Sequence, residues 1–220
     1  MERSLESERA RNMLIQRITD GNIGYNSLIS ERKLSEELGI GRTPTREAIR
    51  DLVNDGILEA IPARGTFLRR LSMKQVRDIF EVRCSLESLA AYLTAKQGIS
   101  RSLSRFSSTF KVFLEDLEGN DPKKMSEMGE AFHRELVLSA DNEALYEILT
   151  PLRIRYQVAF NLPRHFDHRW IRHSVKAHLA ILEAIEIRDA PLSKKLMRNH
   201  LREGLEIRLR IMNRLTEGPI

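Results

Sequence analysis

The segment 30–67 constrains the fold of this chain more than any other segment. Leucines at helical spacing stop at Gly39, and a second stretch with helical apolar spacing begins a few residues later. That stretch ends at Gly56, and two short strand-like runs follow on either side of a turn at residues 62–65. A helix, a glycine turn, a second helix and a hairpin together predict a winged helix-turn-helix.

The second helix of this motif has two chemically different faces. Thr43 is predicted to cap it through its hydroxyl, and Pro44 suits the first helical position. Its buried face is expected to hold Ala48, Ile49, Leu52 and Val53. The opposite face carries Arg42, Arg46 and Arg50. Long cations on the unburied side of a short helix are what a DNA groove receives.

The residues predicted to contact DNA lie on both helices and on the hairpin. Arginine binds the guanine edge with two hydrogen bonds, and threonine hydroxyls and helix N-termini bind phosphate. A glycine at the hairpin tip allows close approach to a backbone or minor groove. The predicted contacts are Arg32, Arg42, Thr43, Thr45, Arg46, Arg50, Arg64 and Gly65. In the alternative interpretation, these arginines form a solvated face paired with carboxylates such as Glu47 and Asp51.

Composition limits the function classes without choosing one. The chain of 220 residues has a formal charge of +5 and a sequence pI near 9.5, which mildly favours polyanionic partners. Cys84 is the single cysteine, so no internal disulfide can form, and a cytoplasmic location is predicted. No apolar run approaches the roughly 18 residues of a membrane span, so no membrane association is expected.

The sequence outside the winged motif is predicted to be helical. A first helix is predicted over residues 5–19, and Ser72 with Gln75 forms a capping-box pattern that opens the second half. Breaks at glycine, proline and Asp-Asn positions leave helices at 73–97, 101–118, 122–139, 142–161, 168–188 and 191–214. The predicted fold is mainly α, with a winged helix-turn-helix domain at residues 1–71 and an all-α six-helix bundle at residues 72–220.

Three of the six histidines are predicted to point into this bundle. His133, His178 and His200 each share a helical stripe with apolar residues, and they lie on three different helices. Three inward imidazoles can meet on one divalent metal. The alternative is three separate, hydrogen-bonded core residues. The other histidines, His165, His168 and His173, are interpreted as surface residues.

The first part of the chain resembles the DNA-binding domain of the GntR family of bacterial transcription regulators. The resemblance rests on the segments 34–39, 42–48, 56–58 and 64–67, with Leu52. It implies operator contacts by Arg32, Arg42, Thr43, Arg46 and Gly65, and it implies a homodimer. The family usually has a Pro-Gly turn before the position of Leu28, where this chain has Gly24 and Tyr25.

The second half is similar to the FCD effector-binding domain of the FadR-like branch of that family. The matching residues are Arg83, Leu86, Glu87, Ala90, Ala91, Phe132, His133, Asn142, His178, Ile181, Leu182, Ala184, Ile185, His200 and Leu201. The resemblance implies a metal held by one aspartate and three histidines beneath a pocket for a small carboxylate. Gly129 stands where that family has the aspartate.

Gly129 in place of the aspartate changes the metal site that we expect. We hypothesise a retained three-histidine site for a divalent metal such as zinc or nickel, with water or an effector carboxylate in place of the missing ligand. Glu130 lies about 100° further round the helix and is a poor substitute for the aspartate. Arg83 is predicted to bind an anionic effector, because a guanidinium grips a carboxylate in two places. An ion pair with Glu87, four residues on, is the alternative.

The sequence therefore predicts a transcription regulator and no enzyme. It is expected to bind double-stranded operator DNA at an inverted repeat as a homodimer, to repress transcription, and to respond to a small organic acid. A metal-dependent hydrolase with a three-histidine zinc site is the alternative, although the chain lacks the H-E-x-x-H and G-x-S-x-G motifs. A non-specific architectural DNA-binding protein is a third interpretation.

Overall fold

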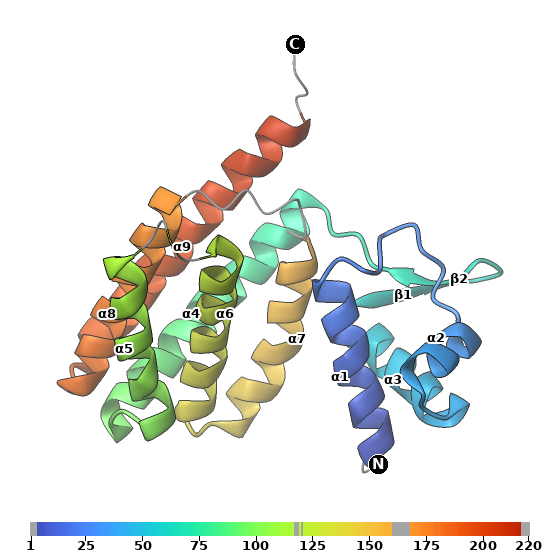
Figure 1. The fold of residues 1–220 in the computed structure, drawn as a ribbon, viewed down its shortest axis with the longest axis horizontal. Helices are drawn as coiled ribbons and strands as arrows, with labels where there is room; N and C mark the ends of the chain where they lie inside the picture. The colour runs from blue at the N-terminus through green and yellow to red at the C-terminus, as the bar shows by residue number, and fades with distance from the viewer. Residues whose placement is uncertain (1–3, 117–118, 120, 160–167, 217–220) are drawn as a thin grey trace. The chain divides into compact units, whose positions relative to one another are not determined.

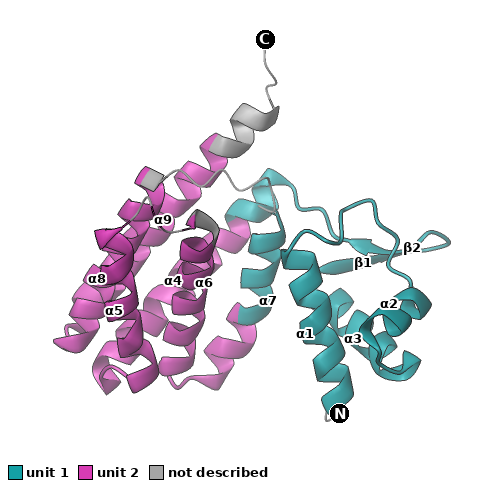
Figure 2. Ribbon diagram, viewed as in Figure 1, with its two compact units in different colours: residues 1–77, 150–161 teal, residues 78–149, 162–220 magenta. Residues whose placement is uncertain are grey.

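The computed structural model describes residues 4–116, 119, 121–159 and 168–216. Helices dominate these residues, and strands occur there in one short hairpin (Figure 1). The chain divides into two compact units, one of residues 1–77 and 150–161 and the other of residues 78–149 and 162–220 (Figure 2). The predicted fold class is confirmed, whereas the division into residues 1–71 and 72–220 stays a prediction.

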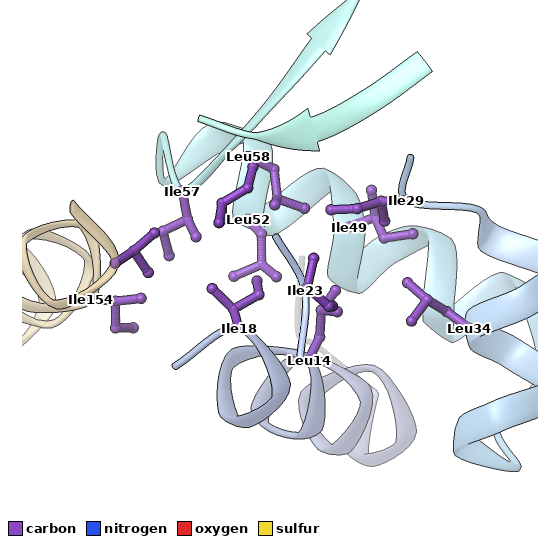
Figure 3. Packing of buried hydrophobic residues seen from close by; sticks show 12 residues of the cluster. Leu14, Ile18, Ile23, Ile29, Leu34, Ile49, Leu52, Ile57, Leu58 and Ile154 are labelled. Carbon is purple, nitrogen blue, oxygen red and sulfur yellow. The ribbon is translucent and has the colours of Figure 1, made fainter. Parts of the chain in front are cut away.

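The first unit contains the predicted winged helix-turn-helix. It consists of α1 (Leu5–Thr19), α2 (Glu31–Leu38), α3 (Arg42–Asn54), β1 (Leu58–Ile61) and β2 (Gly65–Leu68). Apolar side chains from all three helices and from the hairpin meet in one core cluster (Figure 3). The labelled side chains in Figure 3 that point into it include Leu14, Ile18, Leu34, Ile49, Leu52 and Leu58. Burial of this face fixes which side of α3 remains in solvent.

Local sequence signals explain the two helices and the turn between them. The Ser30 hydroxyl accepts a hydrogen bond from the Lys33 N–H and caps α2, and Gly39 ends α2 in the left-handed conformation, with φ 64°. The prediction that Thr43 caps the next helix is wrong. Helix α3 begins at Arg42 with Gly41 as its N-cap, and no side chain caps it. Pro44 therefore lies third in the first turn, where a missing N–H has no helical partner to lose.

The hairpin is the predicted wing. Its strands pair antiparallel with Leu58 opposite Leu68 and Ile61 opposite Gly65. An isolated bridge from Ile29 to Thr66 ties the loop before α2 to the second strand. Gly65 has a φ of 105°, and a Cβ at this position would collide with the Leu28 side chain. Glycine at residue 65 is thus required by the backbone of the wing itself.

Helix α7 (Glu143–Ala159) contributes residues to the cores of both units. Leu145 and Leu149 belong to a core cluster of the second unit. Ile154 and Val158 belong to the core cluster of the first unit. Pro151 lies inside the helix, close to where the two sets meet. The sequence predicted this helix but did not predict that its second half packs with the DNA-binding elements.

The loop before α2 is anchored to the same part of α7. The Tyr25 hydroxyl donates a 2.8 Å hydrogen bond to the backbone carbonyl of Val158, and burial raises the pKa of Tyr25. The Tyr25 ring packs against the core of the first unit, and the Arg70 guanidinium lies over its face. Tyr25, which stands where the resembling family has a Pro-Gly turn, therefore holds this loop by a tertiary contact.

The predicted helices of the second half are all present. They are α4 (Met73–Gln97), α5 (Arg101–Glu115), α6 (Pro122–Ser139), α7, α8 (His168–Glu186) and α9 (Ala190–Thr216). The Ser72 and Gln75 side chains accept from each other's backbone N–H, which confirms the capping box. Helix α5 ends before the predicted residue 118, because Asp116 leaves the helical conformation. The predicted residues 160 and 161 of α7 and the break at Pro163 lie outside the described residues.

Aromatic rings fill the centre of the second unit. Phe110 of α5 and Phe132 of α6 are fully buried and meet edge to face, with centroids 5.7 Å apart. His178 of α8 lies 4.6 Å from Phe132 and 5.1 Å from Phe110 between ring centroids. Within the described residues, no helix combines the length and apolar content of a membrane span.

Candidate DNA-binding surface and buried histidine centre

The exposed face of α3 carries the predicted DNA-contacting side chains. Arg42, Thr43, Arg46 and Arg50 are all exposed, while Ala48, Ile49 and Leu52 are buried beneath them. Arg32 is exposed on α2. Because the apolar face is committed to the core, the cationic face is the one presented to a partner.

These arginines differ in their partners in the free protein. Arg46 Nε donates to Glu31 Oε2 at 2.9 Å, and both side chains are partly exposed. Arg32, Arg42, Arg50 and Arg64 form no ion pair within the described part of the chain. An exposed ion pair contributes about 0–1 kcal/mol, so phosphate or guanine can replace Glu31 at little cost. Arg46 therefore pairs with Glu31, and not with Glu47 or Asp51, which the alternative interpretation named as partners.

Thr45 does not belong to this surface. It is 1 % exposed, and its hydroxyl donates at 2.9 Å to the carbonyl of Gly41. The sequence placed Thr45 at the helix start, where a hydroxyl is usually accessible, but the helix begins at Arg42, two residues before the predicted first residue Pro44. Its prediction as a phosphate contact is therefore corrected: Thr45 packs in the core, and its hydroxyl bonds the backbone carbonyl four residues earlier.

The tip of the wing presents one cation beside backbone in an unusual conformation. Arg64 and Gly65 are exposed, as predicted. Ala63 adopts a left-handed φ of 61°, which glycine tolerates better than alanine. The strained backbone and the glycine together project Arg64 from the end of the hairpin.

His133, His178 and His200 converge in the second unit, as the sequence predicted. Their Nε2 atoms are 3.3 Å apart for His133 and His178, 3.1 Å for His133 and His200, and 3.0 Å for His178 and His200. All three side chains are buried, and they come from α6, α8 and α9. Of the other histidines, His173 is exposed beside Glu203, His165 lies outside the described residues, and the side chain of His168 is not described.

This environment keeps two of the three rings neutral. Burial, and then the neighbouring His200 and His133, lowers the pKa of His178 well below its ordinary value. Burial, and then His133, lowers the pKa of His200 to about 3. A metal binds the neutral imidazole, so both rings are in the form that ligation requires.

Hydrogen bonds among the rings cannot explain the cluster. A neutral imidazole nitrogen either donates or accepts. Among three mutually adjacent Nε2 atoms, at least one pair must therefore be two donors or two acceptors. Two nitrogens on one zinc lie about 3.0 Å apart at a right angle and about 3.4 Å apart at the tetrahedral angle, given Zn–N distances of about 2.0–2.1 Å. The distances between the three Nε2 atoms therefore agree with shared coordination of a divalent metal, and they do not agree with a set of mutual hydrogen bonds.

Gly129 lies next to this cluster on α6. A Cβ at this residue would lie 3.2 Å from Cε1 and 3.9 Å from Nδ1 of His178. Glycine thus lets the His178 ring lie closer to the α6 backbone than a side chain at this residue would allow without a shift of the ring. Glu130 does not replace the aspartate, since its Oε1 lies 3.5 Å from Nη2 of Arg208.

Arg83 is buried and committed to Glu87. Its Nε and Nη2 donate to Glu87 Oε1 at 2.9 and 2.7 Å. This is the ion pair that the sequence left open as the alternative, so an effector would have to share Arg83 with Glu87. Glu87 Oε2 also lies 2.9 Å from Nδ1 of His133. This contact was not predicted, because spacing shows that two side chains share a helix face but not which residues of a neighbouring helix meet that face.

A winged helix-turn-helix joined to a helical unit with a buried histidine centre defines a DNA-binding transcription regulator. The chain matches "Bacterial regulatory proteins, gntR family" over residues 6–68 and "FCD domain" over residues 78–203. The FCD match alone spans more than half of the chain. The protein therefore belongs to the GntR family of transcriptional regulators and carries an FCD domain.

Similar proteins agree with this assignment. The chain is 26 % identical over 199 residues to a probable D-xylose utilization operon transcriptional repressor of Paenarthrobacter nicotinovorans, which covers 90 % of this chain and 87 % of that protein. It is 30 % identical over 156 residues to the Nta operon transcriptional regulator of Aminobacter aminovorans, covering 70 % of each. The solved structure of E. coli McbR/YncC shares the fold, with a TM-score of 0.81 at 18 % identity over 95 % of this chain and 99 % of that one. Nothing in these comparisons supports the hydrolase alternative.

Proposed function

We propose that this regulator represses transcription by binding an inverted-repeat operator as a cytoplasmic homodimer, and that a small organic acid in the helical unit modulates this binding. The exposed cationic face of α3 carries the proposal. Repression is supported by likeness to a protein named as an operon repressor. Two DNA-binding heads on a two-fold dimer match two half-sites, and one short half-site supplies too little affinity.

In the proposed complex, α3 enters the major groove. Arg42, Arg46 and Arg50 reach base edges or the flanking phosphates, and Thr43 donates to phosphate at the helix start. Arg32 contacts the backbone from α2. Arg64 and Gly65 approach the backbone or the minor groove from the wing. Thr45 is left out of this interface because its hydroxyl is used within the helix.

The proposed sensor is a divalent metal, zinc or nickel, held by His133, His178 and His200. The neutral state of two of these rings and the convergence of their Nε2 atoms support it. A bound divalent cation would supply positive charge in a buried site. Gly129 leaves a protein ligand position unfilled, and the carboxylate of an effector is the proposed occupant, with Arg83 nearby as a second cation.

Coupling between this sensor and the operator must act in both directions. If the effector weakens operator binding by some factor, the operator weakens effector binding by the same factor.

The DNA-binding part is tested with alanine variants on a duplex recovered by footprinting the region around the protein's own gene. Arg46→Ala should weaken specific binding by about 1–3 kcal/mol and relax the preference at one base position. Arg32→Ala should weaken binding to all sequences and reduce the salt dependence by about one charge. Arg105→Ala, an exposed arginine on α5, removes the same charge from the other unit and should change neither. An unchanged affinity of Arg46→Ala would remove α3 from its proposed role.

The sensor part is tested by thermal unfolding of protein made without a histidine tag. Small carboxylates are screened with zinc or nickel and after chelation, because a ligand of the native state raises the melting temperature. Stabilisation by a carboxylate that requires the metal supports the proposal. A protein that takes up neither metal under any of these conditions refutes the metal centre.

A further inference from the structure

A chain of three buried polar side chains leads from α4 to the histidine centre. Arg83 holds Glu87 Oε1 by two hydrogen bonds, and Glu87 Oε2 lies 2.9 Å from Nδ1 of His133. The exposed fractions of the three side chains are 5 %, 0 % and 8 %. The carboxylate therefore stands between a guanidinium and one imidazole, with each oxygen facing a different partner.

The contact fixes which nitrogen of His133 can carry the proton. A carboxylate accepts and cannot donate when ionised, so Nδ1 must be the protonated nitrogen if the pair is to attract. A neutral ring with the proton on Nδ1 has its lone pair on Nε2. That lone pair faces His178 and His200.

The other two rings are held differently. Within the described residues, none of the three Nδ1 atoms meets the criteria of a hydrogen bond, but Nδ1 of His133 has a carboxylate oxygen at 2.9 Å, whereas Nδ1 of His178 and Nδ1 of His200 have no carboxylate within 4 Å. The His178 ring is instead packed against both Phe110 and Phe132. His133 is thus the member of the cluster whose tautomer is set by a charged neighbour.

We propose that Glu87 is a positioning residue that holds His133 as its Nδ1–H tautomer and aims its Nε2 lone pair at the metal, with Arg83 holding Glu87 in place. This inference rests on the proposed metal centre. Oε1 accepts from Arg83 and Oε2 lies beside Nδ1 of His133, so in this proposal Glu87 acts through His133 and is not itself a ligand. The Oε2 atom lies off the direction of the ring N–H in the free protein. Alignment of such contacts commonly completes when the bound species is present.

Zinc alone is the probe for the first test, with affinity measured by competition against a chromophoric chelator. Glu87→Gln keeps the shape and removes the charge, and it should lower zinc affinity by about 10–100-fold, the usual effect of losing an outer partner of a histidine ligand. Glu203→Gln is the matched control, since Glu203 lies 2.6 Å from Nε2 of the exposed His173. It should bind zinc like the parent. Parental affinity in Glu87→Gln would overturn the inference.

The second test uses the parent protein, so its result does not depend on whether a variant folds. Long-range ¹H–¹⁵N correlation spectra of the metal-free parent report which nitrogen of each histidine carries the proton. The inference expects Nδ1–H at His133, and a protonated Nε2 would overturn it. Failure of the parent to bind zinc would instead refute the proposed metal centre, while these spectra would still decide the role of Glu87.

Discussion

Gly129 determines how the histidine centre differs from one with a fourth protein ligand. An aspartate at this residue would extend from the same side of α6 as His133, one turn earlier, toward the space beside His178. Glycine inside a helix costs about 1 kcal/mol relative to alanine, so its presence needs a local reason. The close approach of the His178 ring supplies one reason, and an open ligand position for an anion is the further reason that we propose.

Replacement of Gly129 tests that reason. Gly129→Asp should raise zinc affinity and abolish the stabilisation by carboxylate effectors, because the new side chain takes their position. Gly129→Ala is the control, since its Cβ brings the same crowding against His178 Cε1 at 3.2 Å without a ligand. Titrations with zinc and with a carboxylate identified by thermal shift measure both effects. Undiminished effector binding in Gly129→Asp would show that the anion binds elsewhere.

The buried histidines also predict how stability depends on pH. In the unfolded chain a histidine has a pKa near 6.5, while the folded pKa of His178 is well below that value and the folded pKa of His200 is about 3. Below about pH 6.5 the unfolded state therefore binds more protons than the folded state. Acidification should lower the free energy of unfolding of metal-free protein by about 1.4 kcal/mol per pH unit for each of the two histidines.

Urea unfolding of chelator-treated protein at pH 7.5, 6.5 and 5.5 measures this dependence. Above about pH 6.5 both histidines are neutral in the folded and in the unfolded state, so they do not lower the free energy of unfolding there. Below pH 6.5 the free energy of unfolding decreases, because the unfolded state takes up their protons. His200→Gln should reduce the slope, whereas His173→Asn, which changes an exposed histidine, should leave it unchanged. Equal stability of the parent at pH 7.5 and pH 5.5 would contradict the buried, neutral state of these rings.

For individual residues, the sequence predicted which residue types form the site better than it predicted their contacts. The three histidines could be found because each shares a helical stripe with apolar residues. The Arg83–Glu87 pair was one of two open interpretations. The role of Thr45 was misjudged, because the start of a helix shifted by a few residues exchanges an exposed position for a buried one. Cross-helix partners such as Glu87 with His133 leave no periodic signal in one sequence.

The wing depends on glycine for two separable reasons, backbone angle and space. Gly65→Ala should lower the free energy of unfolding by about 2 kcal/mol, since it combines a left-handed φ with a contact that forces the exposed Leu28 side chain to move. Gly39→Ala introduces only the unfavourable backbone angle, because nothing lies within 4 Å of the added Cβ, and it should lower the free energy of unfolding by about 1 kcal/mol. Gly24→Ala has neither problem and should be neutral or slightly stabilising. Chemical denaturation ranks the three variants, and a different order would contradict this account of the hairpin.

Helix α7 is predicted to stabilise the DNA-binding elements through its second half. Tyr25→Phe removes the hydroxyl that donates to Val158 and should cost about 0.5–1.5 kcal/mol. Tyr92→Phe is the matched control, because within the described residues its ring contacts two lysines and its hydroxyl has no partner. Hydrogen exchange of amides in α1 and α3 measures the loss locally. Unchanged protection in Tyr25→Phe would show that α7 does not support this unit.

Elements were predictable where local chemistry marks their ends. Ser72 with Gln75 marks the start of one helix and Gly39 marks the end of another, and the structure has the start of α4 and the end of α2 where these signals place them. The packing of Ile154 and Val158 with residues far earlier in the chain was not predictable, because their apolar spacing fits any core. Tertiary contacts, and not propensity, decide which unit receives this half-helix.

At the level of the whole molecule, we propose that the exposed guanidinium groups of α3 read a DNA sequence. The fold and the family support DNA binding. Any operator must be compatible with the geometry of the heads, so an inverted repeat is the expected form for a two-fold dimer.

Selection from random and genomic duplexes by the 220-residue protein is the sharpest test of sequence reading by α3. The parent is predicted to enrich one short inverted repeat, and the double variant Arg42→Ala/Arg46→Ala is predicted to lose that enrichment while keeping its folded helical unit. Enrichment of no duplex by folded parent, or of the same sequence by the double variant, would contradict the account.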